Sequence, residues 1–173
     1  NPFPTPSGKI EIFSELLAEM DNPRIPPVPK YIEAAEGPRD PLRELFPIQL
    51  ITTHYRRRVH SIFENIPWLA ELEQDALWIN PVDATPRGIK DGHMVRVFNQ
   101  RGIVVVRVKV TERIIPGVVN IHEGAWYNPD SEGVDRGGCA NVLTLDEHSP
   151  GGAFIGNTCL VQVEKEGSIR LPL

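Results

Sequence analysis

Alternating apolar and polar positions predict several short strands along this chain. The clearest pair covers residues 94–98 and 103–111, which flank a turn at 99–102 where Gly102 would supply a positive φ. In the second strand Arg107 and Lys109 alternate with valines, so one face is expected to meet solvent. Further strands are predicted from shorter apolar runs at residues 9–12, 46–53, 118–121 and 160–164.

Helix signals are few and mark short helices. Ser14 is a candidate N-cap for residues 15–20, and Pro67 stands at the first position of residues 67–72. Asn80 and Pro81 begin a third helical turn that Gly88 would end. Several short strands with a few short helices predict a mainly β fold, a barrel or a sandwich, and not a doubly wound α/β sheet.

Proline and glycine are unevenly distributed. Ten of the 17 prolines lie in the first 47 residues, whereas 12 of the 14 glycines lie at or after Gly88. Because proline fixes φ and removes a hydrogen-bond donor, residues 22–29 are expected to run extended along a surface. We therefore predict a connecting strap with a short strand and helix over residues 1–45, and a barrel domain over residues 46–173. A chain that begins with a Pro-rich connection, and without a targeting signal, is expected to be a piece of a longer protein.

Composition and charge exclude several classes of function. The 173 residues carry a net charge of −5, which argues against a nucleic-acid partner, and they contain no apolar run long enough for direct membrane insertion. Cys139 and Cys159 lie 20 residues apart without a C-x-x-C motif, and the five histidines show no paired ligand spacing. No metal site is predicted from these residues. No G-x-S-x-G motif indicates a hydrolase, and no catalytic residue is assigned.

The segment 52–61 follows a predicted strand and is rich in hydrogen-bond donors. It combines three consecutive arginines with two histidines and three aliphatic hydroxyl side chains. Guanidinium groups match phosphate oxygens, so the segment could hold an anionic ligand that carries a heterocycle. The alternative is a solvated basic turn that pairs with neighbouring acids.

Residues 123–157 show little periodicity, and a segment of this length without regular structure is usually functional. Two Gly-rich loops, 133–141 and 151–157, each end at an asparagine. Such loops can present backbone N–H groups to phosphate oxygens, although plain β-turns explain the same composition. Trp126 either packs over the rim of the barrel or stacks near a ligand.

Six ordered motifs resemble one family. They lie at residues 5–12, 57–61, 78–92, 124–127, 135–144 and 160–165. Together they resemble the C-terminal part of molybdopterin oxidoreductases of the dimethyl sulfoxide reductase type, including the anaerobic catalytic subunits. The resemblance implies a double-psi β-barrel that binds a molybdopterin dinucleotide. In this family the domain closes over a bis(molybdopterin guanine dinucleotide) cofactor with molybdenum, which is shared with preceding domains.

The resemblance also implies roles for particular residues. Five are expected to contact the pterin or its phosphates: Thr53, His54, Arg58, His60 and Ser61. Asn141 and Asn157 are expected in cofactor-contacting loops, and Trp126 near the substrate funnel or the pterin. The family's molybdenum ligand, and any Fe–S cluster, belong to domains that this chain does not contain.

The function that follows is that of a cofactor clamp in a larger enzyme. The parent would reduce an S-oxide, an N-oxide or a similar substrate by oxygen-atom transfer, and the chain alone would be inactive. Expected partners are the remaining domains of the catalytic subunit, an iron–sulfur electron-transfer subunit and a membrane anchor. The expected compartment is the bacterial periplasm or its membrane, with the cytoplasm as the alternative. The competing hypothesis is a free-standing double-psi barrel that binds peptides or partner proteins.

Overall fold

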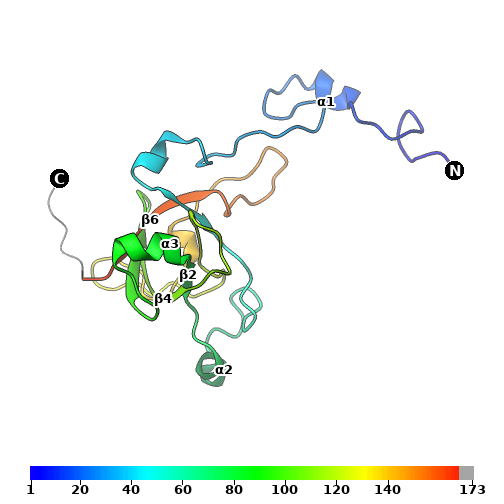
Figure 1. Ribbon diagram of the computed structural model, residues 1–173. Helices are drawn as coiled ribbons and strands as arrows, with labels where there is room; N and C mark the ends of the chain where they lie inside the picture. The colour runs from blue at the N-terminus through cyan, green and yellow to red at the C-terminus, as the bar shows by residue number, and fades with distance from the viewer. Residues whose placement is uncertain (168–173) are drawn as a thin grey trace. The chain divides into compact units, whose positions relative to one another are not determined.

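The computed structural model describes residues 1–167 of the chain (Figure 1). These residues form two compact units, one made of residues 1–33 with 148–154 and the other of residues 34–147 with those from 155 onward. The domain boundary between residues 45 and 46 stays a prediction. Among the described helices, none has both the length and the apolar character that crossing a membrane requires.

The first unit contains one short helix, α1 (Glu15–Glu19). The Oγ of Ser14 accepts a hydrogen bond from the backbone N–H of Leu17, which confirms the predicted N-cap. The strand predicted at residues 9–12 was wrong, because the structure has no strand there. Local hydrogen bonds hold this segment instead: the backbone N–H of Ser7 donates to the Glu11 carboxylate over 3.0 Å. An apolar–polar alternation makes a strand only where another strand pairs with it.

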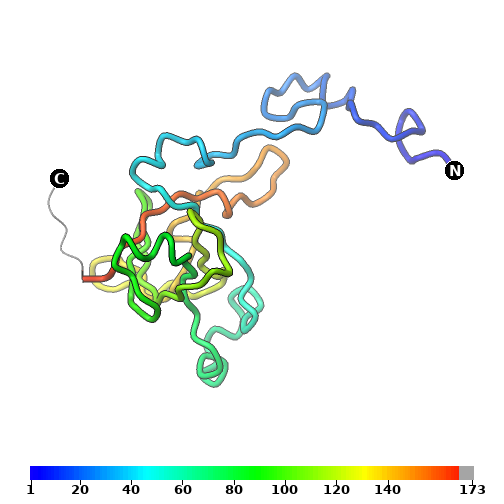
Figure 2. Tube along the Cα trace, viewed as in Figure 1, coloured from blue at the N-terminus to red at the C-terminus, as the bar shows by residue number. Residues whose placement is uncertain are grey.

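The second unit is built on a closed barrel (Figures 1 and 2). Its six strands follow the spatial order β1-β5-β2-β4-β3-β6. The strands are β1 (Ile48–Ile51), β2 (Leu77–Ile79), β3 (Met94–Phe98), β4 (Ile103–Val110), β5 (Val118–Asn120) and β6 (Cys159–Lys165). The prediction of a mainly β barrel with a few short helices is confirmed. Strand β2 was missed, because three residues are too few to show alternation.

Strand direction gathers the long connections at one end of the barrel. Strand β1 is parallel to β5, and β2 is parallel to β4, while the four remaining pairs are antiparallel. Parallel neighbours need long crossover connections, as a double-psi barrel requires. As a result, β1, β3 and β5 end at the rim where β2, β4 and β6 begin. We call this end the loop rim, formed by residues 52–76, 99–102, 121–147 and 155–158.

The short helices lie in the connections. The second unit contains α2 (Pro67–Leu72), α3 (Pro81–Ala84), η1 (Pro41–Glu44), η2 (Thr85–Arg87) and η3 (Ala140–Val142). The side chain of Asn80 caps α3 by accepting from the N–H of Val82, and Gly88 ends η2 with a φ of 63°. Both predicted Pro-initiated helices are therefore confirmed.

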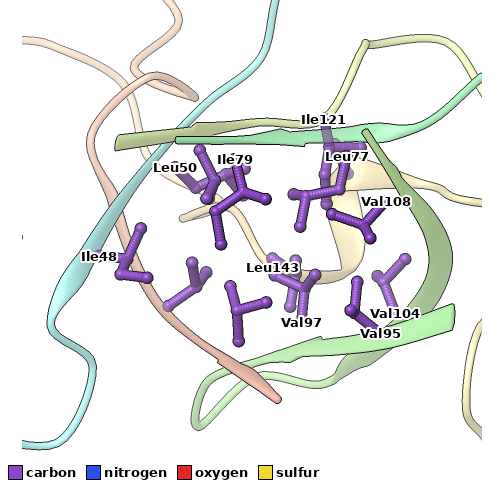
Figure 3. Packing of buried hydrophobic residues seen from close by; sticks show 14 of the residues in the cluster. Ile48, Leu50, Leu77, Ile79, Val95, Val97, Val104, Val108, Ile121 and Leu143 are labelled. Carbon is purple, nitrogen blue, oxygen red and sulfur yellow. The ribbon is translucent and has the colours of Figure 1, made fainter. Parts of the chain in front are cut away.

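The core fills the barrel interior with branched aliphatic side chains (Figure 3). Leu50, Ile79 and Val97 are fully buried there and come from three different strands. Leu143 is also fully buried, although it follows η3 and belongs to no strand. The connection that carries Leu143 thus closes the barrel at the loop rim.

The β3–β4 hairpin is as predicted, but its glycine has another role. Arg107 and Lys109 are exposed on β4, which confirms the solvated face. Gly102 does not have a positive φ. A Cβ at this position would lie 2.6 Å from Cγ1 of Val142, so the last residue of η3 packs directly on the Gly102 backbone.

A buried carboxylate fixes the start of the second unit to the barrel. Glu36 is 4% exposed, and its carboxylate accepts both terminal guanidinium nitrogens of Arg101. The same carboxylate accepts the backbone N–H of Leu160 over 2.7 Å. Burial, opposed in part by Arg101, raises the pKa of the neighbouring Cys159 thiol to about 11, so the thiol is neutral at physiological pH.

Replacement of the buried leucine at the barrel end tests its role in the core. We expect Leu143→Ala to lower the free energy of unfolding by about 2–5 kcal/mol, because the cavity is lined by strands that cannot collapse. Leu72→Ala is the matched control, since Leu72 is 62% exposed at the end of α2 and should change stability by less than about 0.5 kcal/mol. Urea denaturation measures both, and equal losses would contradict the assignment.

Candidate functional site

The structure brings most of the predicted site residues to the loop rim. Thr53 follows β1, and both its backbone N–H and its hydroxyl donate to Oδ1 of Asn120 at the end of β5. Asn157 precedes β6, and its Oδ1 accepts the backbone N–H of Thr52 over 2.6 Å. These side-chain bonds continue the β1–β5 and β1–β6 pairings beyond the strands. Hydrogen bonds of Asn157 with Thr52 and of Asn120 with Thr53 therefore hold the first two residues of the donor-rich segment.

The guanidinium of Arg58 anchors that segment from inside. Its side chain is 3% exposed and makes ion pairs with Glu64 over 2.7 Å and with Asp75 over 2.6 Å. A terminal nitrogen also donates to the backbone carbonyl of Glu123, and the guanidinium lies over the ring of Tyr55. Pairing with neighbouring acids, the alternative left open by the sequence, thus describes Arg58. Its predicted contact with a cofactor stays a prediction, but its charge is already balanced within the protein.

Asp75 connects Arg58 to a buried histidine. Its second oxygen lies 2.6 Å from Nδ1 of His122, which is 7% exposed. Burial alone would raise the pKa of Asp75, but the hydrogen bond with His122 and the charge of Arg58 outweigh it and lower the pKa. Asp75 is therefore an ionised link between the loop after β1 and the residues after β5.

The turn that presents His60 and Ser61, which we call the histidine turn, is strained and tightly enclosed. His60 has a φ of 52°, which is rare for a residue other than glycine. Gly124 lies against it so closely that a Cβ there would be 2.0 Å from the carbonyl oxygen of His60. The indole N–H of Trp126 donates to the carbonyl of Ser61 over 2.8 Å. The residues after β5 thus hold this turn in one conformation.

Glu123 is a rim residue that the sequence analysis missed. Its carboxylate oxygen Oε1 lies 2.8 Å from Nδ1 of His54 and 2.9 Å from Nδ1 of His60. The two imidazole side chains are mostly exposed, and their ring centroids are 5.1 Å apart. A possible signal was the position of Glu123 just after a predicted strand, which is where loop-borne functional residues often lie.

The Gly-rich loop 133–141 is ordered by a carboxylate of its own. Asp135 is fully buried and accepts four backbone N–H groups, those of Asn128, Gly137, Gly138 and Cys139. The expectation that these glycine N–H groups are available to phosphate oxygens was wrong for Gly137 and Gly138, because Asp135 already occupies them. The close approach at Gly137, where a Cβ would lie 1.9 Å from the Trp126 carbonyl, positions Trp126 instead.

The remaining predicted residues differ in their surroundings. Trp126 is half exposed beside the Ser61 turn. Asn141 is exposed on η3, and within the described residues no hydrogen bond joins it to the histidine turn. The structure therefore groups Thr53, Asn157 and the histidine turn, with Asn141 farther along the rim.

The exposed donors at the rim fit a phosphate-bearing heterocyclic ligand. The imidazoles of His54 and His60 and the hydroxyl of Ser61 are open to solvent. The amide nitrogen of Asn157 donates no hydrogen bond among the described residues, because the carbonyl side of that amide faces Thr52. Imidazole, hydroxyl and amide groups hydrogen-bond both phosphate oxygens and heterocycle edges. The fold and this rim define a barrel domain with a preformed polar ligand surface.

Comparison with known proteins identifies the family. A family model described as the molydopterin dinucleotide binding domain matches residues 48–158, and the chain belongs to this family. The resemblance to the dimethyl sulfoxide reductase family is confirmed by alignment of 95% of the chain with two of its members. Binding of a molybdopterin dinucleotide is the role shared by the domain.

The chain is similar to several curated reductases. It is 48% identical to dimethyl sulfoxide reductase DmsA of Escherichia coli (strain K12), over 95% of this chain and 21% of the relative. It is 40% identical to a trimethylamine-N-oxide reductase of Haemophilus influenzae, with the same two coverages. The chain thus spans about a fifth of the length of these relatives. Acetylene hydratase from Pelobacter acetylenicus has the same fold, with a TM-score of 0.75 at 20% identity over 93% of this chain and 24% of that one.

A methyl group at Gly124 should disturb the histidine turn. Gly124→Ala meets both an unfavourable φ of 90° and the His60 carbonyl, whereas Gly117→Ala meets a φ of 80° with no atom within 4 Å. We expect Gly117→Ala to cost about 1–2 kcal/mol from φ alone. Gly124→Ala should cost about 1–3 kcal/mol more from the close contact. Thermal unfolding and amide chemical shifts of residues 54–61 measure the effect, and equal stability of the two variants would refute it.

The charge of Asp75 predicts a pH dependence of stability. Because folding lowers its pKa, the ionised carboxylate stabilises the fold above the unfolded value, and this contribution is lost as the pH falls through the folded value. Asp75→Asn should therefore lower the free energy of unfolding by about 2 kcal/mol at pH 7. The difference from the unsubstituted chain should shrink below about pH 4. Urea denaturation across pH tests this, with exposed Asp146→Asn as control; a difference independent of pH would contradict it.

Proposed function

We propose that this chain closes over the pterin cofactor of a molybdenum oxidoreductase that reduces an S-oxide or an N-oxide by oxygen-atom transfer. The observation that carries the proposal is the set of exposed donors on the loop rim, His54, His60, Ser61 and Asn157. The names of the relatives, dimethyl sulfoxide reductase and trimethylamine-N-oxide reductase, support the substrate class.

The proposed ligand is bis(molybdopterin guanine dinucleotide) with molybdenum, held jointly with other domains of the parent enzyme. His54, His60 and Ser61 would contact the pterin or its phosphates, and Asn141 and Asn157 would contact the cofactor from neighbouring loops. When bound, such a cofactor supplies two electrons that, with two protons, convert the oxide oxygen to water and leave a sulfide or an amine. The protein contributes orientation, hydrogen bonds and the exclusion of water.

Each rim residue has a distinct proposed task. The exposed imidazoles and the Ser61 hydroxyl form hydrogen bonds to the ligand, and Trp126 lies beside them as a flat apolar surface. Arg58 is a positioning residue, because its ion pairs with Glu64 and Asp75 hold the neighbouring histidine turn in place. Thr53 holds the start of the same segment through Asn120. Thr53 and Arg58 are also proposed to contact the pterin or its phosphates.

The parent enzyme would supply what this chain lacks. Because the chain spans about a fifth of its relatives, the proposed partners are first the remaining domains of the catalytic subunit. An iron–sulfur subunit would deliver electrons, and a membrane anchor would hold the complex at the bacterial periplasmic side. The chain alone would therefore bind cofactor weakly and turn over no substrate.

Cofactor binding can be observed directly on the chain in a buffer without added divalent metal ions. We expect purified bis(molybdopterin guanine dinucleotide) to shift the amide resonances of residues 53–61 and 124–127 at the loop rim. Residues 88–93, at the opposite end of the barrel, should stay unchanged because β3 begins there. His60→Ala should weaken the binding at least about fivefold, the effect of one lost hydrogen bond.

The matched control is His93→Gln, which retains an acceptor for the Lys90 N–H at the opposite end and should bind as the unsubstituted chain does. Unchanged rim resonances at saturating cofactor would refute the proposal. Shifts confined to residues 88–93 would refute the placement at the loop rim.

A further inference from the structure

Two histidines and a glutamate bring their side-chain ligand atoms together at the loop rim. The ligand atoms of His54, His60 and Glu123 all lie within 4.8 Å of one another. Both Nδ1 atoms approach the same carboxylate oxygen, at 2.8 and 2.9 Å. That oxygen is buried, yet within the described residues it has no hydrogen-bond partner. The oxygen is therefore held between the two imidazole nitrogens at ion-pair distance, without an aligned hydrogen bond to either ring.

The backbone holds the three residues in this arrangement. The N–H of Glu123 donates to the carbonyl of Thr53 over 2.9 Å, and the carbonyl of Glu123 accepts from Arg58. His60 stands in its strained turn against Gly124. The three side chains therefore come from two segments, residues 53–61 and 123–124. Hydrogen bonds and the close packing of Gly124 fix these segments to each other.

This ligand set has the chemistry of a divalent transition-metal site. Two imidazole nitrogens and one carboxylate oxygen are the protein ligands of many zinc centres that keep a fourth position open. Tetrahedral Zn²⁺ at about 2.0–2.1 Å from each ligand requires ligand atoms about 3.3 Å apart. The two nitrogen–oxygen distances must each widen by about half an ångström, which the exposed imidazole side chains permit by rotating.

We propose that His54, His60 and Glu123 form a three-ligand site for a divalent transition metal ion, with the open fourth position facing solvent at the loop rim. The metal would take the buried oxygen of Glu123 and one nitrogen of each imidazole as its ligands. This goes beyond cofactor binding, because the metal and the dinucleotide would use the same two histidines and so exclude each other. The sequence did not predict the site, since Glu123 is distant from both histidines along the chain.

Zn²⁺ titration of the full chain tests the site. We expect one equivalent to bind by calorimetry, with chemical shifts confined to the residues around His54, His60 and Glu123. Zinc K-edge absorption should show a first shell of nitrogen and oxygen ligands with the outer-shell scattering of imidazole, and no sulfur. His60→Ala and Glu123→Gln should each weaken binding at least about tenfold. His54→Gln provides a third variant at an exposed side chain, where folding is least affected.

Three controls separate this site from other causes of binding. His148→Ala removes an exposed histidine elsewhere, and Glu132→Gln removes an exposed acid; both should bind zinc as before. Cys139→Ser should also leave the affinity unchanged. Three results would overturn the proposal: absence of zinc binding, sulfur in the absorption spectrum, or a zinc affinity in all three ligand variants that equals that of the unsubstituted chain. The cofactor titration is run without added divalent metal ions, so a failure of the zinc experiment does not change the result of the cofactor experiment.

Discussion

The buried guanidinium of Arg58 is the interaction on which the loop rim depends. A charge removed from water must be paired, and Arg58 is paired with Glu64, with Asp75 and with the carbonyl of Glu123. Glu64 belongs to the loop after β1, Asp75 lies just before β2, and Glu123 follows β5. One side chain thus joins two parts of the β1–β2 connection to the start of the connection after β5, and the strand order brings both connections to the same end of the barrel. His54 and His60 flank Arg58 in the sequence, so the ion pairs of Arg58 hold the segment that carries both histidines.

A second buried charge orders the longer connection. Asp135 gathers four backbone N–H groups, and it thereby gives a fixed shape to a loop that has no strand of its own. Gly124 and Gly137 then allow this loop to approach the histidine turn and Trp126 without side chains between them. The rim is therefore formed before any ligand arrives. A preorganised surface loses little conformational entropy on binding, which favours a domain that completes a shared site.

Sequence patterns predicted the elements whose evidence is local. The β3–β4 hairpin was found because Arg107 and Lys109 alternate with valines beside a glycine turn. The three α-helices were found because Ser14, Pro67 and Asn80 mark where they begin. Strand β2 is too short to alternate, and residues 9–12 alternate without a partner strand. At the site, the density of donors in residues 52–61 was visible. Which of three consecutive arginines is buried was not, because Asp75 and Glu123 approach Arg58 only in the folded barrel. Asp135 was likewise hidden, since its role depends on loop geometry.

The charge of Glu123 constrains what the rim can hold. A carboxylate beside His54 and His60 repels an anionic phosphate unless positive charge balances it. Protonated imidazoles provide that balance for a dinucleotide, whereas a bound divalent cation provides it by using the neutral imidazoles as ligands. The two occupants therefore use the same pair of rings in different ways, as hydrogen-bond donors or as metal ligands. A rim built with histidines, and not with lysines, can serve either, because imidazole alone among basic side chains is both a hydrogen-bond donor and a metal ligand near neutral pH.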